Sequence, residues 1–128
     1  MLKQQSGFTL IELIAVLVIL GILAATAVPK FINLSEEAQT AATESIAGSI
    51  ESASALNHAV DVAVEAGLST DPFEVVDDCQ DGENLLSGGL PVGYTIATVA
   101  VTDKVPTDCV LTHTSSGDTA GFTVIGAQ

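Results

Sequence analysis

An almost uninterrupted apolar run of twenty-one residues, positions 8–28, constrains this chain more than any other feature. As an α-helix it would rise about 31 Å, which matches the hydrocarbon core of a bilayer. One carboxylate, Glu12, lies near the start of the run. Because an acid inside the hydrocarbon core costs on the order of 2.5 kcal/mol or more, Glu12 should find a partner or stay near the interface.

The residues on either side of the apolar run predict its orientation. Seven residues precede it and carry Lys3 as their only charge, whereas all acids except Glu12 follow residue 28. The positive-inside rule therefore puts the N-terminus in the cytoplasm and the rest of the chain outside. A secretory signal peptide, cut near the small residues 24–27, and a plain uncleaved anchor are the alternatives. An ordinary signal would not hold an acid five residues into its hydrophobic region.

The residues Gly7-Phe8-Thr9-Leu10-Ile11-Glu12-Leu13, followed by an apolar run and Pro29, resemble the class III signal of type IV prepilins and their pseudopilin relatives. The resemblance implies cleavage between Gly7 and Phe8 by a prepilin peptidase of the inner membrane, which also N-methylates Phe8. It further implies that subunits leave the membrane and pack into a helical filament through their N-terminal helices.

The resemblance also divides the chain into three parts. Residues 1–7 are expected to be a cleaved leader, and residues 8–34 a membrane-spanning half-helix that later forms the filament core. Residues 35–128 would form an α/β head in the periplasm and then outside the cell.

Cleavage after Gly7 would give Phe8 an α-amino group, which is ordinarily cationic at neutral pH. Glu12 is the only acid within reach of this amine in the apolar segment. In the family, the glutamate at this position pairs with the N-terminal amine of a neighbouring subunit, which would make Phe8 and Glu12 the assembly residues here. The alternative is that Glu12 only reaches the cytoplasmic face of the membrane.

Gly21 and Pro29 are the expected kink positions of the helix. Proline lacks the backbone donor and clashes with the carbonyl four residues earlier, here that of Ala25. We therefore expect a kink or a break where the chain leaves the lipid. The resemblance implies that the region between Gly21 and Pro29 can also loosen in a filament.

A second helical pattern follows the proline, with Asn33 or Ser35 available as a cap and Gly67 as its terminator. The expected apolar stripe contains Ala42, Ile46, Ile50, Ala53, Val60 and Val64. The expected polar stripe contains Glu44, Glu51, His58, Asp61 and Glu65. Joined to the apolar run, this pattern predicts one helix of about 88 Å over residues 8–66, with its apolar half protruding.

The rest of the chain predicts an α+β fold, in which the long N-terminal helix packs against a small antiparallel β-sheet. Residues 71–89 have the composition of a loop, and strands are expected over 92–101, 109–114 and 121–125. Cys79 and Cys109 are the only cysteines. In a small exported domain they predict a disulfide, which would tie the loop to the sheet and contribute about 3.5–4 kcal/mol.

Charge and composition narrow the range of functions expected for the chain. The formal net charge is −13, from sixteen acids against three lysines, so direct nucleic-acid binding is not expected. The acids Asp77, Asp78, Asp81 and Glu83 surround Cys79 without the spacing of an EF-hand, and a solvated acidic loop is the preferred interpretation. His58 and His113 are expected to be surface residues. No catalytic residue, metal or cofactor is expected.

The sequence therefore favours a non-enzymatic structural subunit of a type IV pilus, working in attachment or motility. Residues 29–34 resemble pilins of the mannose-sensitive haemagglutinin kind. The expected partners are other copies of the chain, the prepilin peptidase, the inner-membrane pilus assembly machinery and, before assembly, the membrane itself. The alternatives are a pseudopilin of a type II secretion system, which a disulfide disfavours, and a monomeric membrane-anchored binding module.

Overall fold

The computed structural model describes residues 6–128. Lys3 and most of the expected leader lie outside these residues, whereas Gly7 and Phe8 lie within them. The described chain forms two compact units, which divide between Glu37 and Ala38.

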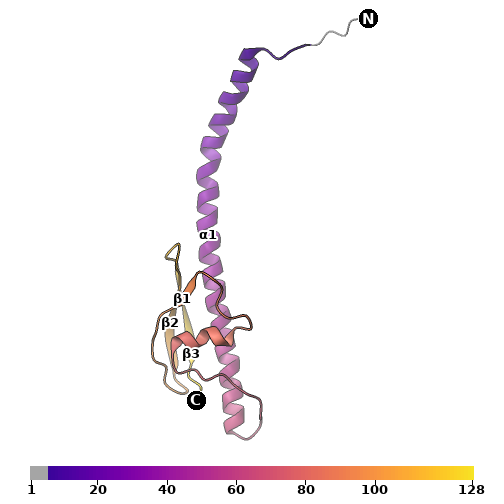
Figure 1. Cartoon of the computed structure of the whole chain (residues 1–128). Coiled ribbons are helices and arrows are strands. Elements are labelled where there is room, and N and C mark those ends of the chain that lie inside the picture. The colour runs from indigo at the N-terminus through magenta and orange to yellow at the C-terminus, as the bar shows by residue number, and fades with distance from the viewer. Residues whose placement is uncertain (1–5) are drawn as a thin grey trace, which may run out of the picture. The chain divides into compact units, whose positions relative to one another are not determined.

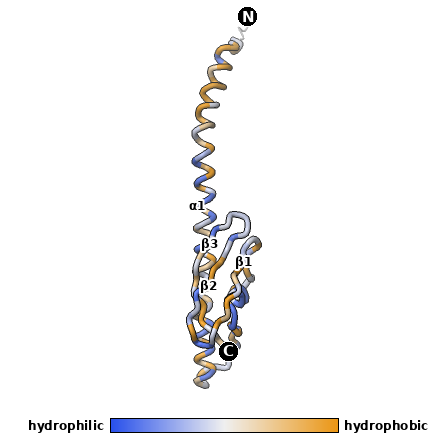
Figure 2. Tube along the Cα trace, turned by 90° about the vertical axis from the view of Figure 1, so that its left-hand side faces the viewer, coloured by the Kyte–Doolittle hydropathy of each residue, from blue (hydrophilic) through white to orange (hydrophobic). Residues whose placement is uncertain are grey.

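Helix α1 (Leu10–Glu65) contributes to both units. In the first unit every described residue is exposed, and Figure 2 shows the beginning of α1 as a hydrophobic stretch. Pro29 lies inside α1, which continues through it, so the break considered above does not occur. A bend at Gly21 or Pro29 stays a prediction. Among the described elements, α1 is the helix long and apolar enough to cross a membrane.

The C-terminal end of α1 is closed by a glycine in the left-handed region, as expected. Gly67 has a φ of 70°, and its N–H donates to the carbonyl of Val64 at 3.0 Å. The N–H of Leu68 donates to the carbonyl of Ala63 at 2.8 Å. These two bonds form a Schellman motif, which satisfies carbonyls that the helix end leaves free.

The second unit contains a three-stranded antiparallel sheet in the order β1-β2-β3, which lies beside α1 in Figure 1. The strands are β1 (Tyr94–Ile96), β2 (Pro106–His113) and β3 (Thr119–Ile125). Alternate residues of β2 and β3 are buried, as in a sheet with one face on a core. The expected meander is therefore confirmed.

The expected strand over 92–101 is wrong beyond Ile96. The N–H of Val101 donates to the carbonyl of Asp77 at 2.7 Å, and the carbonyl of Val99 accepts from the N–H of Cys79 at 2.9 Å. The chain leaves β1 because its backbone groups at 99–101 pair with the segment at 77–79 instead.

The expected loop over 71–89 is also wrong in part, because it contains the 3-10 helix η1 (Cys79–Leu85). Asp78 caps η1, with its side chain accepting from the N–H of Gln80 at 2.9 Å. The carboxylate of Asp81 accepts in return from the N–H groups of Asp77 and Asp78, at 3.1 and 2.9 Å. Two of the acids assigned to a solvated loop, Asp78 and Asp81, therefore stabilise local backbone structure.

The stripe of α1 that packs against the head differs from the expected one. Its fully buried residues are Thr43, Ala47, Ile50, Ser54 and Asp61. Ala42, expected in the apolar stripe, is exposed, and Asp61, expected in the polar stripe, is 0% exposed. The other core side chains come from the sheet and its connections, including Val76, Leu111 and Val124.

Candidate functional site

The start of α1 is built around two of the residues singled out by the sequence. The N–H and the hydroxyl of Thr9 both donate to Glu12 Oε2, at 2.8 and 2.7 Å. The N–H of Glu12 makes a longer bond of 3.4 Å to Thr9 Oγ1. This arrangement is a capping box, in which a threonine and a glutamate three residues later satisfy each other's backbone donors.

Thr9 is therefore a residue of the site that our sequence analysis did not identify. The sequence does contain a pattern that indicates this role of Thr9, because Thr-x-x-Glu before an apolar run is typical of a capping box. The box has a consequence for Glu12, since it positions the carboxylate at the first turn of the helix. Within the described residues Glu12 Oε1 accepts no hydrogen bond, so this oxygen can accept one from another group.

The structure does not bring Phe8 and Glu12 together as an ion pair. Phe8 is joined to Gly7 in the described chain, so its nitrogen is an amide and not the amine that the pairing needs. Both residues are exposed. Gly21 and Pro29 lie further along α1, where the hydroxyl of Thr26 donates to the carbonyl of Leu23 at 2.9 Å.

In the head, the expected disulfide between Cys79 and Cys109 is confirmed. It joins η1 to β2, with 5.8 Å between the two Cα atoms. Both cysteines are buried. The bridge closes a segment of 30 residues, which supports a head with few aromatic side chains.

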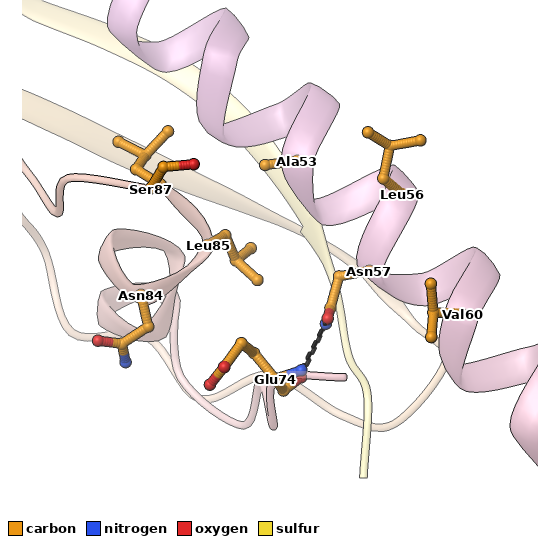
Figure 3. A pocket seen from close by; sticks show the side chains of 9 residues that line it. Ala53, Leu56, Asn57, Val60, Glu74, Asn84, Leu85 and Ser87 are labelled. Carbon is orange, nitrogen blue, oxygen red and sulfur yellow. Dashed lines mark hydrogen bonds between the residues drawn. The ribbon is translucent and has the colours of Figure 1, made fainter. Parts of the chain in front are cut away.

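A groove of about 400 Å³ runs between α1 and the segment around η1 (Figure 3). Its walls include Ala53, Leu56, Val60 and Leu85. At one side the Asn57 amide bridges to the backbone of Glu74, donating to its carbonyl at 2.7 Å and accepting from its N–H at 2.8 Å. The lining contains neither histidine nor cysteine, so the groove offers apolar contact and amide hydrogen bonds.

The two histidines are not simple surface residues. The side chain of His58 is 25% exposed, and its Nδ1 lies 3.8 Å from an oxygen of the buried Asp61. His113 is half-buried, and its ring centroid lies 4.9 Å from that of Tyr94.

His113, Ser116 and Asp118 form a hydrogen-bonded series, but not in the order of a hydrolase triad. Ser116 Oγ lies 2.8 Å from His113 Nδ1 and also donates to Asp118 Oδ2 at 2.8 Å. The serine therefore lies between the two, and its proton is directed to the carboxylate, whereas a triad needs histidine in the middle. These bonds close the turn between β2 and β3.

The N-terminal region of the chain is similar to that of known proteins. The model of the prokaryotic N-terminal methylation motif matches residues 2–28. The type IV narrow pilus major component PilA5 of Thermus thermophilus is 50% identical over 53 residues, which are 41% of this chain and 46% of the relative. The type II secretion system core protein G of Pseudomonas aeruginosa is 57% identical over 37 residues, 29% of this chain and 26% of the relative.

Two further matches cover almost the whole chain. Two fimbrial proteins of Pseudomonas aeruginosa are each 32% identical over 126 residues, which are 98% of this chain and 77% of the relative. The matches to PilA5 and to core protein G, by contrast, span less than half the length of those proteins. No solved structure matches the chain.

Proposed function

Because the chain belongs to the type IV pilin family, we propose that it is a structural subunit of a surface filament and polymerises through residues 8–34. The observation that carries the proposal is the exposed apolar surface of this segment. Phe8, Leu10 and Ile11 are 89%, 78% and 75% exposed, and the apolar side chains continue to Leu34. Such a surface needs a bilayer or other copies of the chain to cover it.

We propose that a prepilin peptidase of the inner membrane cuts between Gly7 and Phe8 and N-methylates Phe8. The match of the methylation motif to residues 2–28 supports this step. Before the cut, the apolar segment would anchor the chain in the inner membrane with its N-terminus in the cytoplasm. Afterwards, the assembly machinery would transfer the subunit from lipid into the extracellular filament.

Glu12 has the central role in this transfer. Its Oε2 accepts from Thr9 of the same chain, and Oε1 remains available for the amine of Phe8 on a neighbouring subunit. In an apolar filament core such a pair would neutralise both charges, and an unpaired carboxylate there would be strongly unfavourable. The pair would therefore favour one axial register of the subunits over others.

The test is the variant Glu12→Ala in cells that express the chain together with a pilus assembly system. The chain should still enter the membrane, because removing a charge does not hinder insertion, but sheared surface filaments should disappear. Glu44→Ala, which removes another exposed acid of α1, is the matched control and should keep its filaments. Unchanged filaments in Glu12→Ala would contradict the proposal.

Mass spectrometry of the mature N-terminus tests the processing step separately. N-methyl-phenylalanine at position 8 is the expected result. A mature chain that still begins at Met1, or one cut near Ala27, would exclude processing as a prepilin.

A pseudopilin of a type II secretion system is the second candidate, because core protein G shares 57% identity over 37 residues with this chain. The processing chemistry would be the same, so it does not separate the two. Deletion of the gene should remove surface filaments if the chain is a pilin, and should block protein secretion if it is a pseudopilin. A chain that stays monomeric in the membrane in every assay would instead support an anchored binding module.

A further inference from the structure

The two lysines that the structure describes differ in the ion pairs that their side chains form. Lys104 Nζ lies 2.6 Å from Glu65 Oε1 and 3.4 Å from Asp103 Oδ2. The side chain of Lys30, in contrast, forms no ion pair or hydrogen bond within residues 6–128. Lys3 belongs to the leader that processing would remove. In a mature chain of high negative charge, Lys30 would thus be the one lysine side chain available to a partner.

Lys30 borders a distinct surface feature of the first compact unit. An open hollow of about 540 Å³ is lined by Lys30, Phe31, Asn33, Leu34 and Glu37, and we call these residues the 30–37 patch. The patch has a cation at one end, a carboxylate at the other and apolar side chains between them. Phe31 and Leu34 are 71% and 60% exposed, and the side chain of Glu37 forms no ion pair or hydrogen bond within the described chain.

The spacing of Lys30 and Glu37 prevents them from satisfying each other. They are seven residues apart, which is close to two helical turns, so they lie on one face about 10.5 Å apart along the axis. An ion pair needs nitrogen and oxygen within about 4 Å. The same spacing makes the two charges complementary between copies, because a parallel copy displaced by seven residues presents Glu37 beside Lys30.

We propose that the 30–37 patch binds helix α1 of a second copy, with Glu37 of one subunit paired with Lys30 of its neighbour. The inference rests on the filament proposed above, in which every subunit leaves the membrane with its helix in the same direction. In this register Phe31 and Leu34 of the subunit that supplies Glu37 lie at the level of two alanines of its neighbour, seven positions earlier in the sequence, and lose exposure to water there. The partner is therefore another copy of this chain, displaced by about 10.5 Å along the helix axis.

The displacement agrees in direction with the pairing of Phe8 and Glu12. In both contacts the residue nearer the N-terminus of one copy lies beside a later residue of its neighbour. Four residues correspond to about 6 Å and seven residues to about 10.5 Å. The glutamate side chains and the lysine stem are long and flexible enough to span the difference. One axial step can therefore satisfy both pairs.

Charge reversal tests the contact. Lys30→Glu alone and Glu37→Lys alone each place like charges opposite each other, and each should lower the amount of sheared filament by about tenfold, since an attraction becomes a repulsion. The double variant Lys30→Glu/Glu37→Lys restores opposite charges and should recover filaments to near the level of the unmodified chain. Single variants that assemble normally, or a double variant no better than the singles, would overturn the proposal.

The matched control uses the neighbouring acid. The double variant Lys30→Glu/Glu36→Lys has the same composition as the rescuing pair but places the new lysine on another side of α1. It should not restore filaments. Membrane fractions of all variants are compared by immunoblot, so that loss of insertion is recognised separately.

A chemical readout locates the contact directly. Filaments built from an equal mixture of light and heavy isotope-labelled subunits are treated with a zero-length carbodiimide, which joins an amine to a nearby carboxylate. Mass spectrometry should find Lys30 linked to Glu37 in peptides of mixed isotope label. Links of Lys30 to other acids only would contradict the proposal, whereas absence of filaments from the unmodified chain would contradict the proposed function itself.

Discussion

Ser54 on α1 accepts a hydrogen bond from the backbone N–H of Ile125 on β3, with 2.8 Å between Ser54 Oγ and the nitrogen. One turn earlier, Glu51 Oε2 accepts from the N–H of Thr123 at 3.1 Å. β3 is an edge strand of the sheet, and unpaired edge donors can pair with another chain. Two side chains of the helix therefore accept hydrogen bonds from donors of this edge, while other residues of the helix contribute apolar side chains to the core.

Ser54→Ala should destabilise the head by about 1–3 kcal/mol, because it leaves the N–H of Ile125 without its acceptor at a buried position. Ser54 itself is 1% exposed. Chemical denaturation followed by circular dichroism measures the change. Ser52→Ala is the control, since among the described residues the exposed Ser52 hydroxyl bonds only to the carbonyl of Gly48 on its own helix. Equal stability of the two variants would show that Ser54 does not support β3.

The sequence predicted the features that depend on local pattern. The length of α1, its termination at Gly67, the meander and the pairing of Cys79 with Cys109 all followed from periodicity, turn residues and cysteine number. The capping box of Thr9 and Glu12 was also readable from the sequence, although we did not identify it.

The features that were missed depend on contacts between distant segments. β1 ends at Ile96 because the backbone at 99–101 pairs with 77–79, and no local pattern specifies that partner. Likewise, Ser54 is polar in sequence but buried in the fold, because it faces an amide of β3. A hydrophobicity pattern assigns such residues to solvent, so the buried stripe of α1 was predicted incorrectly.

Gly82 in η1 is a position where even a methyl group does not fit. A Cβ there would lie 2.9 Å from Ile50 Cγ2 and 3.6 Å from Phe122 Cε2. Gly82→Ala should therefore lower the stability of the head by about 1–3 kcal/mol through overpacking. Gly88→Ala is the control, because its Cβ would meet nothing within 4 Å. A thermal melt that is the same for both variants would contradict this expectation.

The ion pair of Lys104 predicts a dependence on alkaline pH. The hydrogen bond to Glu65, assisted by Asp103, raises the pKa of Lys104 above its ordinary value of 10.5. The resulting stability is complete below pH 10.5 and is lost as the pH rises through the higher, folded pKa. The contribution is small because Lys104 is solvent-exposed. Melting temperatures from pH 9 to 12 should therefore fall slightly more for the unmodified chain than for Lys104→Met, and parallel curves would contradict the prediction.

Asp61 is the position at which substitution should stabilise the head. Its side chain is 0% exposed, and within residues 6–128 neither carboxylate oxygen accepts a hydrogen bond. His58 Nδ1, at 3.8 Å, is too distant for one. A buried carboxylate without donors is more costly than a neutral amide of the same shape, so Asp61→Asn should raise the free energy of unfolding by about 1–3 kcal/mol at neutral pH. Denaturant titration measures the change. The control is Asp108→Asn, which makes the same substitution at an exposed position. A loss of stability in Asp61→Asn would mean that the folded head depends on the charge of Asp61.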